Sequence, residues 1–238
     1  MNKYLLKDTL LPLVSCIITL SACNLQAQNK SVSVDEFQQE LRQPSVQLLD
    51  VRTAGEYQNG HLANALQADW NNQDQFKDRV QYLDKTKPVL VYCASGVRSA
   101  KAADWLLANG FSSVKNMDGG IVVWKKENKP VEQPDNIKQL TIDEYTASIA
   151  NSGKPIVLVD FGAEWCPPCK KMEPVIAQLQ TELKDQVAII KVDAGINTNV
   201  MSDMKVASIP TFIVYKNGKE TWRKQGVVDA GELKAQLK

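Results

Sequence analysis

The sequence predicts two α/β domains, each built around a largely parallel sheet. Three observations support this prediction. The chain has 238 residues, and a domain usually holds roughly 100–200 residues. Short apolar segments alternate with amphipathic ones in both halves, as strands alternate with helices in α/β folds. Between the halves, residues 125–136 are mostly charged or polar and include two prolines, a composition typical of a linker.

The overall composition is that of an ordinary folded protein. Hydrophobic residues make up 44% and charged residues 23% of the chain, which is too apolar for general disorder. The 28 basic and 27 acidic residues nearly cancel, which argues against a nucleic-acid partner. The single histidine, His61, excludes any site that needs two imidazoles. Five cysteines are too few for a disulfide-stapled miniprotein.

The first residues have the pattern of an export signal. Lys3 and Lys7 precede an apolar run over residues 9–20, which is short for a membrane span and typical of a secretory signal. The next residues, Leu20-Ser21-Ala22-Cys23, resemble the bacterial lipoprotein signal, in which the cysteine is lipidated and becomes the new N-terminus.

This resemblance implies a signal peptide over 1–22, lipidation of Cys23 and a polar tether over 23–30. The protein is then a periplasmic lipoprotein of the cell envelope, held to the membrane by its lipid anchor. Two alternatives are cleavage after Ala27, which gives a soluble periplasmic protein, and an uncleaved anchor. All three export the rest of the chain.

The cysteines of the exported chain are few. Besides Cys23, it contains Cys93, Cys166 and Cys169. A disulfide scaffold outside the cytoplasm normally has more pairs. The sequence therefore indicates reactive thiols rather than structural ones.

The first domain is expected over residues 31–132. Capping boxes at Ser33–Glu36 and Thr53–Glu56 mark two helix starts. We expect strands at Val46–Val51, Val89–Tyr92 and Val114–Met117, and helices from Ser33 to Arg42, from Thr53 to Gly60, from Arg98 to Asn109 and from Ile121 to Lys126.

The second domain is expected over residues 139–238, after a linker over 133–138. Asn217-Gly218 is a strong signal for a type I′ hairpin, so an antiparallel hairpin should follow the parallel part of the sheet. We expect one helix to begin at a capping box at Thr141, a second from Cys169 to Leu183 with a kink at Pro174, and a third from Ala230 to Leu237. The expected strands are Ile156–Phe161, Val187–Val192, Thr211–Lys216 and Glu220–Gln225.

Cys93 stands where a buried strand meets a helix. The run Tyr92-Cys93-Ala94-Ser95-Gly96-Val97-Arg98 places it in a concavity of backbone N–H groups at a helix N-terminus. Such a site lowers the pKa of a thiol and makes its thiolate a good nucleophile. Arg98 adds a positive charge near any anion that approaches.

With its ordered motifs, this half resembles a single-domain rhodanese, a sulfurtransferase. The motifs are Leu49-Asp50-Val51-Arg52, Glu56-Tyr57, the run from Gly60 to Ala65, the Cys93 loop, and the run from Gly119 to Trp124. The resemblance implies that Cys93 carries sulfur as a persulfide and that the amides of Ala94, Ser95, Gly96, Val97 and Arg98 hold it. Asp50, Arg52 and His61 are expected to be structural.

Three alternatives remain for this half. Related phosphatases use a C-x5-R loop, whereas Cys93 to Arg98 is C-x4-R, a smaller ring that suits one sulfur atom. A phosphatase is therefore the weaker enzymatic alternative. The other two are that Cys93 is merely a buried small apolar residue, or that the domain is an inactive module used for docking.

The pair Cys166-Pro167-Pro168-Cys169 follows a buried strand and opens a helix, as a redox pair does. Cys166 is expected at the exposed helix end, where the dipole favours its thiolate. Cys169 is expected to be shielded and placed to resolve a mixed disulfide. Pro168 fits near the first helical position. Zinc is disfavoured, because this half has no histidine and no further cysteine to complete a site.

From Gln139 onward the chain resembles thioredoxin. The motifs are Trp165-Cys166-Pro167-Pro168-Cys169-Lys170, Val159-Asp160-Phe161, Lys191-Val192-Asp193, Ala207-Ser208-Ile209-Pro210-Thr211, and Gly226. The resemblance implies that Cys166 and Cys169 form the active disulfide and that Asp160 assists proton transfer at Cys169. Lys191 is either the charge partner of Asp160 in catalysis or half of a buried structural pair.

Further implications concern substrate binding. Ile209-Pro210 should be a cis bond whose backbone pairs with substrate, and Trp165 should contact substrate. Gly162 stands where thioredoxins commonly have Trp, and Pro167 replaces the usual Gly. No cation stands between the cysteines, which favours a reductant or isomerase over a strong oxidant.

The sequence therefore predicts an extracytoplasmic thiol:disulfide oxidoreductase joined to a sulfurtransferase domain. Its expected partners are disulfide-bonded proteins, a small sulfur donor such as thiosulfate, and a membrane-borne electron donor. No cofactor and no metal are expected. Whether the second domain releases the sulfur of Cys93 stays open. The alternatives are a reductase with an inactive docking domain and a surface adaptor without activity.

Overall fold

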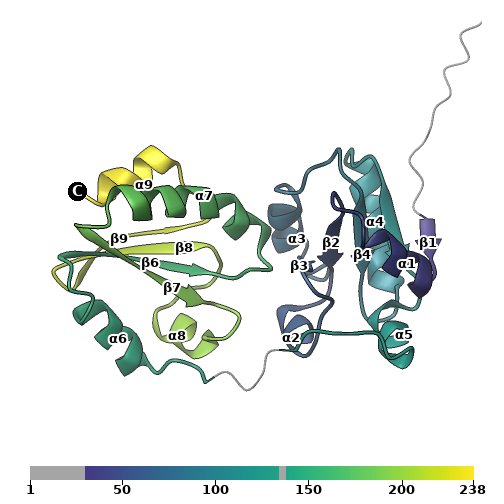
Figure 1. Cartoon of the computed structure of the whole chain (residues 1–238), viewed down its shortest axis with the longest axis horizontal. Coiled ribbons are helices and arrows are strands. Elements are labelled where there is room, and N and C mark those ends of the chain that lie inside the picture. The colour runs from purple at the N-terminus through teal and green to yellow at the C-terminus, as the bar shows by residue number, and fades with distance from the viewer. Residues whose placement is uncertain (1–29, 134–137) are drawn as a thin grey trace, which may run out of the picture.

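A five-stranded, all-parallel sheet forms the first domain of the computed structural model, which describes residues 30–133 and 138–238 (Figure 1). The expected signal peptide, Cys23 and most of the linker lie outside the described residues. The strand order is β1 (Lys30–Val32), β5 (Val114–Met117), β4 (Val89–Tyr92), β2 (Gln47–Asp50) and β3 (Leu66–Gln67). The helices are α1 (Val34–Glu40), α2 (Ala54–Gln58), α3 (Gln73–Val80), α4 (Val97–Ala108) and α5 (Gly120–Lys126).

Strand β4 runs through the centre of this domain. All four of its residues are buried, because helices cover both faces of the sheet, as is usual for parallel sheets. Val89 and Val91 pack into one apolar cluster, and Leu90 and Tyr92 into another on the opposite face. This packing fixes the end of β4, and with it the position of Cys93.

The second domain has a mixed four-stranded sheet. Its strand order is β7 (Val187–Asp193), β6 (Ile156–Gly162), β8 (Thr211–Lys216) and β9 (Lys219–Gln225). β6 and β7 are parallel, whereas β8 is antiparallel to β6 and to β9. The helices are α6 (Ile142–Ala150), α7 (Pro167–Glu182), α8 (Thr198–Asp203) and α9 (Ala230–Gln236).

The hairpin between β8 and β9 turns at Asn217 and Gly218, whose φ angles are +50° and +77°. Positive φ at both central residues is the requirement of a type I′ turn. The predicted fold class is confirmed: a parallel α/β domain is followed by a mixed sheet that ends in an antiparallel hairpin.

Some elements were not predicted. β1 and β3 are only three and two residues long, too short for an alternating pattern. α3 is mostly polar and buries only Phe76, Arg79 and Val80. α8 was also missed. α7 begins at Pro167 rather than Cys169, because Cys166 is its N-cap, and it continues through Pro174.

The two domains contact each other at Trp165. Its carbonyl oxygen accepts a hydrogen bond from the Gln67 N–H at 2.7 Å, and the Arg79 guanidinium lies 5.1 Å from its ring centroid. The Gln58 side chain donates to the carbonyl of Gly195. In Figure 1, α3 faces α7 across this contact, and the two helices touch.

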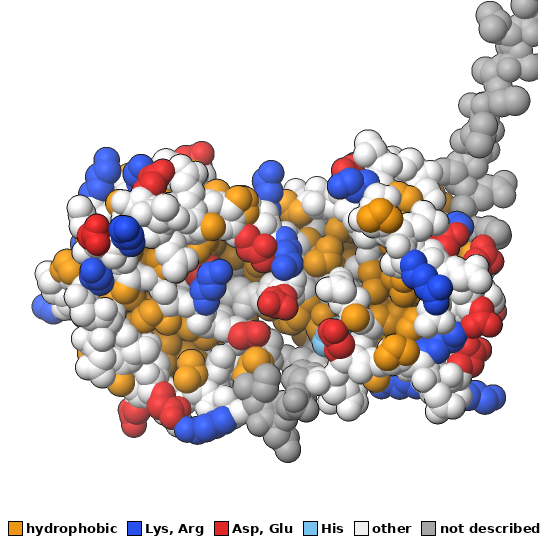
Figure 2. Space-filling model, in the orientation of Figure 1, with side chains coloured by type: hydrophobic (Ala, Val, Ile, Leu, Met, Phe, Trp, Pro, Cys, Tyr) orange, Lys and Arg blue, Asp and Glu red, His pale blue; other side chains and the backbone are white. Residues whose placement is uncertain are grey.

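A cavity of about 470 Å³ remains between the domains, lined by residues that include Tyr57, His61, Glu164, Trp165 and Asp193. Figure 2 shows this face of the molecule hollowed between the domains, with acidic side chains beside the hollow. None of the helices that the structure describes has the length and apolar character that a bilayer crossing requires.

Candidate active sites

Cys93 lies directly after β4 and is completely buried. Its Sγ accepts hydrogen bonds from the Gly96 N–H at 3.2 Å and from the Ser99 hydroxyl at 3.3 Å. Gly96 is the N-cap of α4 and has φ +89°, a left-handed conformation that glycine adopts at little cost. The loop therefore wraps around the sulfur atom and points hydrogen-bond donors at it.

The N-terminus of α5 supports this loop from the other side. Ile121 N–H donates to the Cys93 carbonyl at 2.9 Å, and Val122 N–H donates to the Ala94 carbonyl at 3.1 Å. The approach requires Gly120, which has φ +58°: a Cβ there would lie 2.4 Å from the Cys93 carbonyl oxygen. Gly120 thus lets one helix terminus fix the backbone of the Cys93 loop.

The environment favours the thiolate of Cys93. Burial raises the pKa of this thiol, but hydrogen bonds from the Ser99 side chain and from backbone N–H groups of Ser99, Ser95 and Gly96 outweigh burial. The pKa of Cys93 is therefore lowered from its ordinary value. A thiolate is the nucleophilic form of cysteine.

Arg98 is bound by a carboxylate. Its Nη1 and Nη2 donate to the two oxygens of Glu56 at 2.8 and 2.6 Å. This hydrogen-bonded pair lowers the pKa of Glu56 to about 2. The same carboxylate raises the pKa of Arg98, and the charge of Cys93 adds to that effect. Arg98 thus lies between a carboxylate and the sulfur site, so part of its charge is already neutralised.

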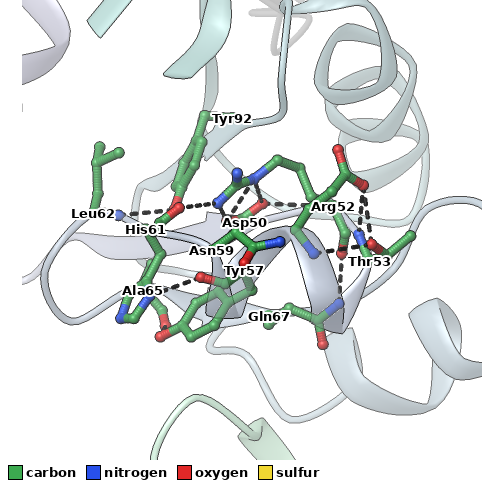
Figure 3. Close-up of polar contacts among 12 residues, drawn as sticks. Asp50, Arg52, Thr53, Tyr57, Asn59, His61, Leu62, Ala65, Gln67 and Tyr92 are labelled. Atoms are coloured by element: carbon green, nitrogen blue, oxygen red, sulfur yellow. Dashed lines mark hydrogen bonds and ion pairs between the residues drawn. The ribbon is translucent and has the colours of Figure 1, made fainter. Parts of the chain in front are cut away.

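The residues expected to be structural form a network beside this site (Figure 3). Arg52 Nε donates to both Asp50 oxygens at 2.9 Å, and Arg52 Nη2 donates to the Gly60 carbonyl at 2.9 Å. The hydroxyl of Tyr92 accepts from the Leu62 N–H at 3.1 Å. His61 stacks on Tyr57, with ring centroids 3.7 Å apart. These contacts join the ends of β2 and β4 to the segment around α2.

Cys166 and Cys169 form a disulfide at the N-terminus of α7, with Cα atoms 5.2 Å apart. Cys166 Sγ lies 3.8 Å from the carbonyl oxygen of Ile209, which precedes the cis peptide bond to Pro210. The structure thus brings Trp165, the disulfide and the Ile209–Pro210 backbone together. Pro167, rather than Pro168, takes the first helical position.

The expectation of an exposed Cys166 is wrong. Cys166 is 0% exposed and Cys169 is 8% exposed. Packing between segments far apart in the sequence buries Cys166. Ile209 packs in the same cluster as both cysteines, and the first domain packs against the neighbouring Trp165.

Asp160 lies on β6 opposite Lys191 of β7. Burial raises the pKa of Asp160 to about 6, while the charge of Lys191 opposes this shift and that of Glu173 adds to it. Asp160, Lys191 and Cys169 line one cavity of about 270 Å³. Gly162 also lines this cavity. Because glycine has no side chain, it leaves open the space beside the Cys169 sulfur, where a Cβ would lie 3.7 Å from that atom. A carboxyl with this pKa can exchange protons near Cys169 at ordinary pH.

Two residues of the Cys93 site were not anticipated. Ser99 lies beyond the loop motif, but it is placed one helical turn after Gly96 and so can reach back to the sulfur. Glu56 was placed in a helix cap and in a rhodanese motif, but no contact with the Cys93 site was predicted for it. It does form a capping box with Thr53, and it also binds Arg98. Within the ranges 30–133 and 138–238, His, Cys, Asp and Glu form no group suited to holding a metal.

Comparison with known proteins gives two family matches. Residues 33–127 match the family described as rhodanese-like domain, and residues 136–238 match thioredoxin. The chain therefore joins a rhodanese-like domain to a thioredoxin domain that carries a pair of cysteines. The chain belongs to the thioredoxin family, and its N-terminal half is a rhodanese-like domain.

Relatives match different shares of the chain. Thioredoxin X, chloroplastic, of Arabidopsis thaliana is 30% identical over 156 residues, which cover 60% of this chain and 85% of that protein. Thioredoxin of Rickettsia felis is 37% identical over 40% of this chain and 89% of its own length. Thioredoxin Y, chloroplastic, of Oryza sativa is 35% identical over 42% of this chain, which spans only 59% of that relative. A rhodanese-like domain protein from Staphylococcus aureus, known from a crystal structure, is 34% identical in sequence to this chain. The match covers 44% of this chain and 99% of the S. aureus chain, with a TM-score of 0.39.

Proposed function

We propose that this protein is an extracytoplasmic protein-disulfide reductase whose rhodanese-like domain carries sulfane sulfur on Cys93. One observation supports this most strongly: each reactive sulfur follows a buried strand and lies at the start of a helix, Cys93 before α4 and Cys166 before α7. Helix N-termini stabilise thiolates. The chain thus carries two nucleophilic sulfur centres.

The sulfur-loading step uses the Cys93 thiolate. It attacks the outer sulfur of thiosulfate, a new S–S bond forms, the bond between the two thiosulfate sulfurs breaks, and sulfite leaves. The resulting perthiolate keeps a negative charge, which the donors on Gly96 and Ser99 can bind. Arg98 supplies further positive charge on the approach to this site.

The dithiol exchange begins at Cys166. Its thiolate attacks a substrate disulfide and forms a mixed disulfide, while one substrate sulfur leaves as a thiolate. Asp160 accepts the proton of Cys169, which then attacks Cys166 and releases the reduced substrate. The backbone at Ile209 and Pro210 and the ring of Trp165 hold the substrate chain. A membrane-borne donor returns two electrons to the Cys166–Cys169 disulfide.

The two centres can be coupled by the same chemistry. The Cys166 thiolate attacks the outer sulfur of the Cys93 persulfide and takes it, leaving the Cys93 thiolate. Cys169 then attacks Cys166, forms the disulfide and expels the sulfur as hydrosulfide. The two electrons that reduce the sulfur come from the dithiol.

The proposed location rests on the N-terminal sequence. The basic and apolar run before Leu20-Ser21-Ala22-Cys23 is the pattern of a lipoprotein signal. These residues lie outside the described part of the chain. Lipidation of Cys23 would hold both domains at the membrane surface, near a membrane-borne electron donor.

A second candidate is a reductase with an inactive rhodanese-like domain that serves in docking. Two observations favour it: Cys93 is fully buried, and the guanidinium of Arg98 is occupied by Glu56. The two candidates differ in whether Cys93 accepts sulfur.

The test is intact-mass analysis with an insulin-reduction assay on the same preparation. When thiosulfate is added while the Cys166–Cys169 pair is oxidised, the proposal predicts a gain of one sulfur mass in the wild type. Cys166→Ser should gain it as well, but Cys93→Ser should not. Insulin reduction should persist in Cys93→Ser and be lost in Cys166→Ser. No sulfur gain from any donor would favour the docking candidate, and no insulin reduction by the wild type would contradict the reductase assignment.

A further inference from the structure

The rhodanese-like domain covers the dithiol segment, which we define as residues 165–169. Both cysteines and both prolines of this segment are buried. Trp165, at its start, packs against the apolar cluster of the rhodanese-like domain, and α3 lies against α7. Thiol–disulfide exchange requires direct access of the attacking sulfur to the substrate disulfide. A folded protein substrate therefore has no path to Cys166 in this arrangement.

Three contacts hold the cover in place, and we call them the gate contacts. They are the hydrogen bond from Gln67 N–H to the Trp165 carbonyl at 2.7 Å, the Arg79 guanidinium 5.1 Å from the Trp165 ring centroid, and the bond from Gln58 Nε2 to the Gly195 carbonyl. The ring of Tyr57 adds a tilted contact to Trp165, with centroids 5.6 Å apart. The Trp165 end of the dithiol segment is thus held through both its backbone and its ring.

The three gate contacts are a backbone hydrogen bond, a side-chain hydrogen bond and a cation–π contact, so single substitutions can weaken the cover. Arg79 is 7% exposed, and its hydrogen bonds go to the backbone and side-chain oxygens of Gln67. Burial lowers the pKa of Arg79 to about 10, which reflects the loss of water around the guanidinium. Separation of the domains would expose more of Arg79 to water, which opposes part of the cost of breaking its contact with Trp165.

The contacts at Trp165 are separate from the contacts at the Cys93 sulfur. The residues that contact Trp165 are Tyr57, Gln67 and Arg79, whereas the Cys93 sulfur is enclosed by Gly96 and Ser99. Because Cys166 is buried, the dithiol must leave its covered position to reach a protein disulfide.

We propose that the rhodanese-like domain is a gate over the dithiol, which protects Cys166 in the closed arrangement and admits substrate disulfides only when Gln58, Gln67 and Arg79 release Trp165 and Gly195. The proposal rests on the proposed function in one respect, since it takes Cys166 as the sulfur that attacks substrates. It further implies that the intact protein reacts more slowly with large disulfides than its dithiol chemistry alone allows.

The experiment compares two alkylation rates of Cys166 in the reduced full-length protein. One reagent is N-ethylmaleimide and the other is a maleimide carrying a polyethylene glycol chain, and the labelled Cys166 peptide is quantified by mass spectrometry. The ratio of the large-reagent rate to the small-reagent rate reports how often the gate is open. Free cysteine gives the ratio for an ungated thiol.

Variants of the gate contacts should raise this ratio. We expect Arg79→Met and Gln58→Ala each to raise it about fivefold, the population change that follows from losing one such contact. Arg42→Met and Gln43→Ala are matched controls, because both residues are exposed after α1, and they should leave the ratio unchanged. Gln58→Ala is the variant expected to fold normally if Arg79→Met does not, since it removes only a partly exposed side chain.

Equal ratios in all five proteins, or a wild-type ratio equal to that of free cysteine, would overturn the gate. Insulin reduction is measured on the same samples. If Arg79→Met shows an open dithiol but no protein reduces insulin, the gate stands and the proposed function fails. If insulin is reduced equally fast by every variant and the ratios are equal, the proposed function stands and the gate fails.

Discussion

Arg98 donates two hydrogen bonds, 2.8 and 2.6 Å long, to the carboxylate of Glu56. This pair ties the helix that follows the Cys93 loop to α2. The two residues after Glu56 are Tyr57 and Gln58, which contact Trp165 and Gly195 of the thioredoxin domain. The short helix α2 thus contacts Arg98 of the sulfur site and also contributes two of the side chains that contact the thioredoxin domain.

Replacing Glu56 with Gln should lower the pKa of Cys93. The carboxylate now neutralises part of the Arg98 charge, so its removal leaves the guanidinium free to stabilise the thiolate, by up to about one pKa unit. The pH dependence of Cys93 labelling measures this value. Glu40→Gln, which removes a carboxylate that binds Lys115, is the control. A rise of the Cys93 pKa in Glu56→Gln would contradict this reading of the site.

Removing the Ser99 hydroxyl should have the opposite effect. The Ser99 side chain is the strongest of the contacts that lower the pKa of Cys93, so Ser99→Ala should raise that pKa by about one unit. Sulfur loading from thiosulfate at neutral pH should slow accordingly, as followed by intact mass. Ser95 acts through its backbone N–H, so Ser95→Ala should load at nearly the wild-type rate. Equal slowing by both substitutions would show that the hydroxyl is not responsible.

Gly120→Ala should destabilise the rhodanese-like domain. The substitution forces a left-handed residue with a side chain, which costs about 1–2 kcal/mol, and its Cβ would lie 2.4 Å from the Cys93 carbonyl oxygen. We expect the free energy of unfolding in urea to fall by at least about 2 kcal/mol. A Cβ on Gly55 would meet no other atom within 4 Å, so Gly55→Ala in α2 should be neutral or stabilising. Equal stability of the two variants would refute the proposed packing at Gly120.

The stability of the thioredoxin domain should depend on Asp160 between about pH 4 and pH 6. The pKa of Asp160 is raised to about 6 by burial in the folded protein, so the folded state holds this proton more tightly than the unfolded state. Stability is therefore greatest below the unfolded pKa and falls as pH rises through the folded pKa. The loss is about 2–3 kcal/mol at neutral pH.

Asp160→Asn removes this titration. Its free energy of unfolding, measured with denaturant at pH 4 and pH 7, should decline less than that of the wild type over this range. Asp203→Asn, at an exposed position of α8, should follow the wild type. An unchanged pH dependence in Asp160→Asn would mean that another group is responsible.

Much of the fold could be predicted because it depends on local patterns. β4 and β5 have the predicted bounds, since each is a short buried run flanked by turn residues. The two cysteine sites could be predicted for the same reason, because each motif is continuous in the sequence. Cys93 and the Cys166–Cys169 pair both stand between a buried strand and a helix start.

The cover of the dithiol could not be predicted. It depends on Gln67 and Arg79, which lie about a hundred positions before Trp165, in the polar elements β3 and α3 that carry little apolar pattern. No local sequence pattern predicts that the buried Arg79 contacts Trp165 of the other domain. Burial of Cys166 is a tertiary property for the same reason.

Sulfide release from the loaded protein tests the central claim most directly. The protein is first reduced at its dithiol and freed of reductant, then given thiosulfate and followed for hydrosulfide, with Cys166→Ser and Cys93→Ser in parallel. The account predicts release by the wild type together with formation of the Cys166–Cys169 disulfide, and little release by either variant. Release by Cys166→Ser at the wild-type rate would contradict the coupling of the two domains.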